Sequence, residues 1–108
     1  MPFSDHSEQL ILSSIEDYSL LNKNQKALLK TLIQMSYDLI VLTTIKDLAK
    51  ILKVTNTTIS TAIAALKKNS LIFNLKYRGV IFTGCEINKA EIDRIVSVYT
   101  KKQNLENN

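Results

Sequence analysis

The residues whose types and spacing best suit binding chemistry lie between Thr55 and Asn69, in the segment TNTTISTAIAALKKN. Its apolar residues follow the i, i+3, i+4, i+7 spacing that predicts one buried face of an α-helix: Ile59, Ala62, Ile63 and Leu66. The opposite side carries small, hydrogen-bonding or basic side chains: Asn56, Thr57, Ser60, Thr61, Ala64, Lys67 and Lys68. Such a face can approach another surface closely, and the major groove of DNA is wide enough to admit a helix.

Catalytic and metal-binding chemistry has little support in the sequence. The chain has one histidine, His6, and one cysteine, Cys85, far apart in the sequence, and it lacks a glycine-rich phosphate loop. A single cysteine cannot form an internal disulfide, and we interpret it as a small apolar residue rather than a redox sensor. We therefore expect no enzymatic activity, no catalytic residues, no metal site and no cofactor.

Positive charge is concentrated in the centre of the chain. Residues 44–80 contain seven Lys or Arg against the single acid Asp47, a net charge of +6, whereas the whole chain carries +4. Such localisation is typical of a surface that faces phosphate groups. The alternative is a solvated face that happens to be basic.

Length and composition predict one helix-rich domain. The chain has 108 residues, only two Gly and one Pro, and no apolar run as long as a membrane span. We expect a flexible stretch at 1–6, one domain over 7–103 and a flexible tail at 104–108. The absence of a leader sequence predicts a cytoplasmic protein without membrane contact.

Periodicity and capping signals predict the order of the elements. We expect helices over about 7–19 and 23–36, the second opened by a capping box of Asn22 and Gln25, with Met35 on its inner side. A short strand at 39–42 precedes a helix capped by Thr44, a turn at Val54 and the helix 55–69. Strands at 71–76 and 80–83 form a hairpin that Gly84 ends, and a last helix spans 88–103, opened by a capping pair of Asn88 and Glu91. The predicted fold class is mainly α with a small β-hairpin.

The segment Leu48–Thr55 (LAKILKVT), with Ile59-Ser60 and Leu66–Ile72 (LKKNSLI), resembles the bacterial winged helix-turn-helix pattern. It is similar to MarR-like regulators and to small plasmid replication and partition proteins of the TubR type, over about residues 22–100. The resemblance implies a winged helix-turn-helix with extra terminal helices. Two departures stand out, because Lys53 and Ser70 occupy positions where the family commonly has Gly; Asn69 could take the left-handed conformation in place of Ser70.

This resemblance implies roles for single residues in binding double-stranded DNA. Base edges would face Asn56, Thr57, Ser60, Thr61 and Ala64, a set without Arg that favours A·T-rich sites. Phosphates would be contacted by Lys53, Thr58, Lys67 and Lys68, with Thr55 capping the helix. At the hairpin tip, Lys76, Tyr77 and Arg78 could enter a narrow minor groove or simply form a polar turn.

The terminal helices carry apolar residues that need a burial partner: Leu10, Ile11, Ile15, Ile92, Ile95, Val96 and Tyr99. We expect them to form a homodimer, which would set two recognition helices on inverted half-sites or serve tandem repeats. The alternative is that the last stripe folds back on the core. The expected role is a transcriptional regulator or a plasmid or phage partition factor. The rival is a winged-helix adaptor for a protein partner such as RNA polymerase or replication machinery.

Overall fold

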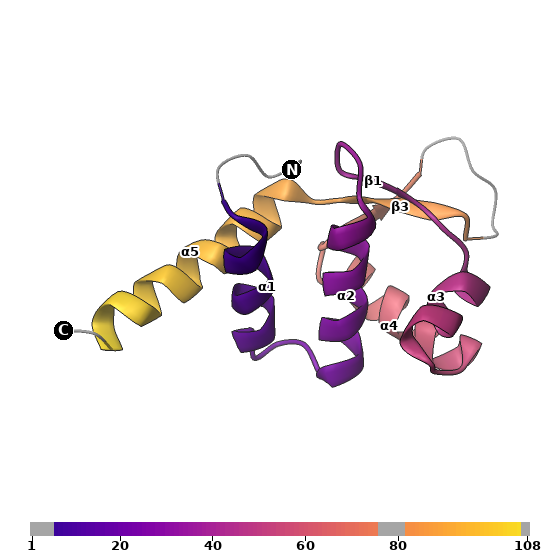
Figure 1. The fold of residues 1–108 in the computed structure, drawn as a ribbon, viewed down its shortest axis with the longest axis horizontal. Helices are drawn as coiled ribbons and strands as arrows, with labels where there is room; N and C mark the ends of the chain where they lie inside the picture. The colour runs from indigo at the N-terminus through magenta and orange to yellow at the C-terminus, as the bar shows by residue number, and fades with distance from the viewer. Residues whose placement is uncertain (1–5, 76–81, 107–108) are drawn as a thin grey trace.

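The computed structural model describes residues 6–75 and 82–106 of the chain, and Figure 1 shows their arrangement. The elements in chain order are α1 (Glu8–Asp17), α2 (Lys23–Met35), β1 (Ile40–Leu42), α3 (Ile45–Leu52), α4 (Asn56–Lys68), β2 (Ile72–Asn74), β3 (Gly84–Ile87) and α5 (Lys89–Glu106). The described chain is mainly helical with a small three-stranded antiparallel sheet, as the composition and periodicity predict. None of the helices in these residues is long and apolar enough to cross a membrane.

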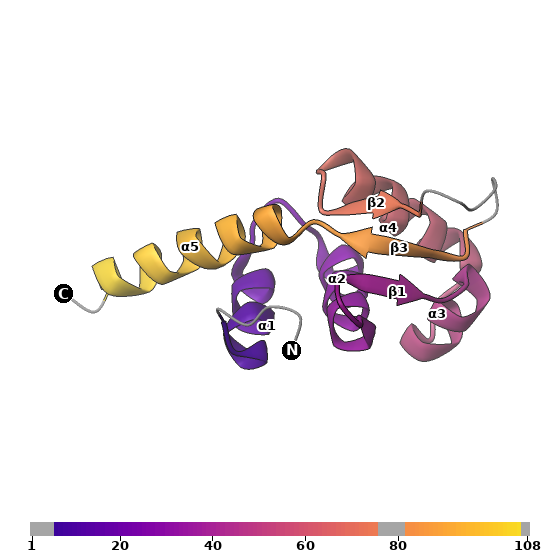
Figure 2. The same cartoon turned by 90° about the horizontal axis from the view of Figure 1, so that it is seen from above.

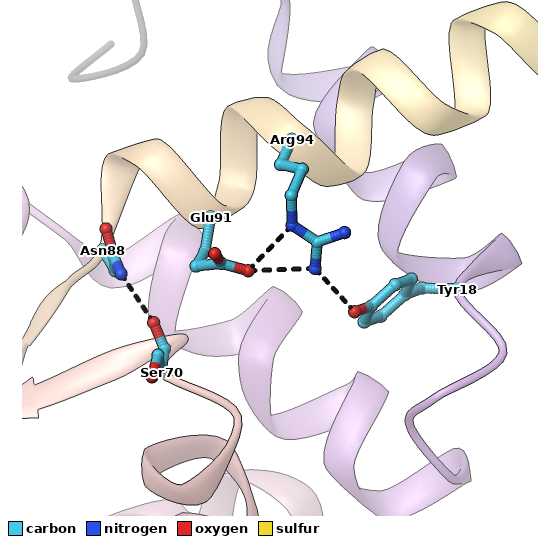
Figure 3. Close-up of polar contacts among 5 residues, drawn as sticks. All are labelled: Tyr18, Ser70, Asn88, Glu91 and Arg94. Carbon is cyan, nitrogen blue, oxygen red and sulfur yellow. Dashed lines mark hydrogen bonds and ion pairs between the residues drawn. The ribbon is translucent and has the colours of Figure 1, made fainter.

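Polar caps fix where four of the helices begin. The side chains of Ser7, Asn22, Thr44 and Thr55 each accept a hydrogen bond from a backbone N–H three residues on. At α2 the predicted capping box is confirmed, because the Gln25 side chain also accepts from the backbone N–H of Asn22. The capping pair of Asn88 and Glu91 expected at the start of α5 is not formed. The Asn88 side chain instead donates to the carbonyl oxygen of Ser70, and Glu91 pairs with Arg94 (Figure 3).

Strand β3 lies in the middle of the sheet, between β1 and β2. Val41 of β1 pairs with Cys85, and Ile72 of β2 pairs with Ile87, and all four side chains are buried against the helices. Alternation along a strand therefore places Ile40, Leu42, Phe73, Gly84 and Glu86 on the opposite, outer face. Figure 2 looks onto that outer face, with α2, α3 and α4 behind the sheet.

The hairpin is shifted from its predicted position. The second strand spans Gly84–Ile87 rather than 80–83, so Gly84 begins a strand that it was expected to end. The reason is burial, because Cys85 and Ile87 supply the inward side chains that cover the core. Residues 80 and 81 lie outside the described part of the chain, and Phe82 and Thr83 are not in a strand. Met35 is also exposed rather than on the inner side of α2.

Two non-glycine residues adopt the left-handed backbone conformation beside α4. Lys53 ends α3 with φ 57° and ψ 46°, at the position where the resemblance anticipates Gly. After α4 the left-handed residue is Ser70, with φ 59°, whereas Asn69 keeps φ −88°. The expectation that Asn69 could relieve Ser70 is therefore wrong, and each Cβ costs about 1 kcal/mol at such a position.

Helices α1 and α5 pack against each other within the one chain. The side chains of their stripe that were expected at a dimer interface are at most 2% exposed: Ile11, Ile15, Ile92, Ile95 and Val96. Leu10 and Tyr99 are half-buried. The stripe folds back on the core, the alternative stated above, and its five buried side chains offer no surface to a second copy.

The second half of α5 extends beyond α1 and projects from the body of the molecule (Figures 1 and 2). The helix ends at Glu106, three residues past the predicted boundary, so residues 104–106 are helical. Arg94 links its first half to the end of α1, since its guanidinium contacts Glu91 and the Tyr18 hydroxyl, both at 3.0 Å (Figure 3).

Candidate nucleic-acid interface

Helix α4 divides into a buried and an exposed face along the predicted line. Ile59, Ala62, Ile63 and Leu66 are at most 5% exposed, because α4 packs on α2 and α3. The side chains predicted to face outward are exposed: Asn56, Thr57, Ser60, Thr61, Ala64 and Lys68. Thr58 and Lys67 lie at the boundary and are half-buried. The exposed residues form one continuous strip of small polar groups with a lysine at its end, which we call the α4 strip.

Two threonines at the start of α4 are engaged within the helix. Thr55 Oγ1 accepts from the backbone N–H of Thr58 at 3.1 Å, and the two hydroxyls are 2.9 Å apart. The predicted capping role of Thr55 is confirmed. Since both hydroxyls already have partners, they are less available to an external ligand than those of Thr57, Ser60 and Thr61.

The structure brings the beginning of α2 beside the α4 strip, which periodicity alone could not show. Asn22, Asn24 and Gln25 line a surface cavity of about 220 Å³ together with four residues of α4: Thr57, Thr58, Thr61 and Ala62. Lys23 lines an adjoining cavity of about 270 Å³ that shares Asn24, Thr58 and Ala62. The capping box located the helix start in the sequence, but only the packing of α2 on α4 places Lys23 and Asn24 near the strip.

The lysines of the central segment lack acidic partners. Among the described residues, Lys46, Lys50, Lys53, Lys67 and Lys68 form no ion pair, whereas Glu16, Asp17, Glu91 and Asp93 all pair with basic residues of α2 and α5. Lys67 instead lies 5.9 Å from the centre of the Phe82 ring, in reach of a cation–π contact. These four acids of the terminal helices thus pair with nearby cations of α2 and α5, and none of them pairs with the lysines around α4.

The predicted hairpin-tip contacts, Lys76, Tyr77 and Arg78, lie outside the described residues. The described residues, 6–75 and 82–106, contain no group of three His, Cys, Asp or Glu side chains that could hold a metal ion.

Cys85 lies buried in β3, with no exposed surface. Burial raises the pKa of its thiol to about 11, although Lys67 acts in the opposite direction. The thiolate is the reactive form, so a raised pKa makes the group inert at neutral pH.

We expect native Cys85 to react with a disulfide reagent such as dithionitrobenzoate roughly a hundredfold more slowly at pH 7 than the same protein unfolded in urea. The rate should rise about tenfold per pH unit as the pH approaches the thiol pKa, because the fraction of the reactive thiolate rises by the same factor. The absorbance of the released thionitrobenzoate at about 412 nm measures both rates. Equal rates in the folded and unfolded protein would contradict the buried position.

None of the family models, curated proteins and solved structures compared with this chain matches it. The case for a function therefore depends on the geometry and charge described above.

Proposed function

We propose that this chain is a winged helix-turn-helix protein that binds double-stranded DNA, with α4 in the major groove. The observation that carries the proposal is the α4 strip, an exposed row of small hydrogen-bonding side chains surrounded by lysines without acidic partners. The order α3, short turn, α4, β2 and β3 supports the winged-helix assignment. A transcriptional regulator or a partition factor would use such a unit, with copies acting together on repeated sites.

The side chains of the α4 strip match the major-groove edges of adenine and thymine. Asn56 can pair bidentately with adenine, and the methyl groups of Thr57, Thr61 and Ala64 fit the thymine methyl. The α4 strip contains no arginine that could pair with guanine. We therefore propose an A·T-rich target, and selection of bound sequences from a random pool tests it. G·C-dominated sites would refute this preference.

The lysines around the strip would position the helix on the phosphate backbone. Lys68 follows the strip at the end of α4, and Lys53 precedes it in the turn. Lys23 and Asn24 add a contact from the start of α2, on the other side of the cavity. Phosphate contacts of this kind fix register without reading sequence.

We expect Lys53→Ala and Lys68→Ala each to weaken DNA binding and to reduce the slope of log affinity against log salt by about 0.9 per lost phosphate contact. Fluorescence anisotropy with an A·T-rich duplex, measured across a salt series, provides both values. Lys26→Ala is the matched control, since Lys26 donates to the Glu16 carbonyl oxygen at 2.6 Å on the side of α2 that faces α1. It should leave the slope unchanged.

The same experiment separates DNA binding from the rival role as a protein adaptor. A double variant, Lys53→Ala with Lys68→Ala, that kept the affinity and salt slope of the unmodified chain would refute the proposed interface. A chain that bound no duplex even at low salt would favour the adaptor, because an electrostatic contact is strongest there.

A further inference from the structure

The outer face of the sheet carries an apolar surface arranged around one carboxylate. Ile40 pairs with Glu86, and Glu86 pairs with Phe73, so these three side chains form a row across the strands. Tyr37 extends the row, because its backbone exchanges two hydrogen bonds with Ile40, at 2.8 and 2.9 Å. Leu42 lies in the neighbouring row, beside Gly84. We call this set of residues the outer sheet face.

This face is exposed. Tyr37 is 86% exposed, Leu42 65% and Phe73 46%, and Figure 2 shows the three strands in front of the helices. Glu86 is half-buried and has no ion-pair partner within the described ranges 6–75 and 82–106. A partner that covers this face must supply a cation, since a buried carboxylate without a partner is costly.

Charge argues against two copies packing sheet on sheet, because such packing would bring two Glu86 carboxylates into one apolar interface. Three strands of three or four residues span roughly 180 Å², well below the ~800 Å² that a stable dimer buries on each partner, so a contact on this face is weak. The face instead fits a single helix that presents a basic residue between two apolar ones.

The projecting half of α5 has this pattern. Val98 is 50% exposed and Leu105 77% exposed, and the exposed Lys101 lies between them on the same side of the helix. Seven residues of helix span about 10.5 Å, and the two strand spacings from Ile40 to Phe73 span about 9.6 Å. Lys102 is already paired with Asp17, at 3.2 Å, which leaves Lys101 as the cation for Glu86.

We propose that the projecting half of α5 in one copy docks on the outer sheet face of a second copy, with Val98 and Leu105 against Ile40 and Phe73 and Lys101 against Glu86. Helix α5 is one continuous helix that runs away from the end of β3 (Figures 1 and 2), so its projecting half does not reach the sheet of its own chain and the contact forms between chains. Such a head-to-tail contact is heterologous: it closes into a ring where the rotation between copies allows this and otherwise propagates into an open array, which is the arrangement proposed here. It deepens the proposal that copies act together, and an array suits tandem repeats better than inverted ones.

Charge exchange tests the contact without DNA, so its failure is separate from failure of DNA binding. We expect the unmodified chain to self-associate weakly, at about 0.1–1 mM, with an average mass that passes the dimer in sedimentation equilibrium. Glu86→Lys and Lys101→Glu should each reduce the mass to that of the monomer. An equimolar mixture of the two variants should recover it, because every interface then joins opposite charges.

Lys50→Glu is the matched control, since Lys50 is an exposed lysine of α3 outside both surfaces; it should leave self-association unchanged. Circular dichroism establishes that each variant is folded. A monomer at every concentration, or a mixture that fails to recover association, would overturn the contact, and a mass that saturates at the dimer would overturn the open array.

Discussion

Replacing Ile95 by Asp is expected to unfold the chain rather than to release a folded monomer. Ile95 is 1% exposed and belongs to the stripe of α5 that packs with α1 in the core. The change removes a buried side chain and places a carboxylate without a cation among apolar groups, a combined loss of about 4 kcal/mol or more. The free energy of unfolding of a domain of this size is only ~5–15 kcal/mol, so the variant should lose most of its helical circular dichroism at about 37 °C.

The matched control lies one helical turn away. Val98→Asp introduces the same carboxylate at a position that is 50% exposed, and it should leave the free energy of unfolding, measured with urea, within about 0.5 kcal/mol of that of the unmodified chain. A folded Ile95→Asp variant with a normal midpoint would show that the stripe is not part of the core. The pair thus distinguishes core packing from the dimer interface expected from the sequence.

Gly84→Ala is expected to destabilise the chain by about 3 kcal/mol. Gly84 has φ 146°, and a Cβ at this position would lie 2.2 Å from the carbonyl oxygen of Val41 and 3.0 Å from Leu75 Cδ1. Because the nearer atom belongs to the backbone of β1, the methyl group can be accommodated only by parting β1 from β3. Urea unfolding followed by circular dichroism measures the loss.

Ser70→Gly provides a control of opposite sign. It removes a Cβ from a residue at φ 59°, and we expect a gain of up to about 1 kcal/mol because glycine adopts this conformation without strain. If Gly84→Ala were as stable as the unmodified chain, the approach of β1 to β3 at Gly84 would be looser than described.

The sequence predicted the helices well because their signals are local. Asn22 and Gln25 determine the start of α2 through contacts within one turn, and Thr44 and Thr55 do the same for α3 and α4. The two faces of α4 also follow from a period of 3.6 residues, which needs no knowledge of the neighbouring elements.

The errors come from features that depend on tertiary packing. Residues 80–83 and 84–87 are both plausible strands by composition, and only pairing with β1 and β2 places Cys85 and Ile87 on the core. Periodicity showed that Ile92, Ile95 and Val96 must be buried but not what buries them. The approach of Lys23 and Asn24 to the α4 strip is likewise absent from local patterns, because it results from the crossing of α2 and α4.

Hydrogen bonds from Asn88 connect the start of α5 to the residues that follow α4. The Asn88 side chain donates to the Ser70 carbonyl oxygen at 2.7 Å (Figure 3). The backbone N–H of Asn88 donates to the Leu71 carbonyl oxygen at 3.0 Å. We therefore expect a tilt of α4 to move the start of this 18-residue helix, and its far end to move through a larger arc. A fluorophore attached near the end of α5 would amplify small changes in the orientation of α4 into a measurable displacement.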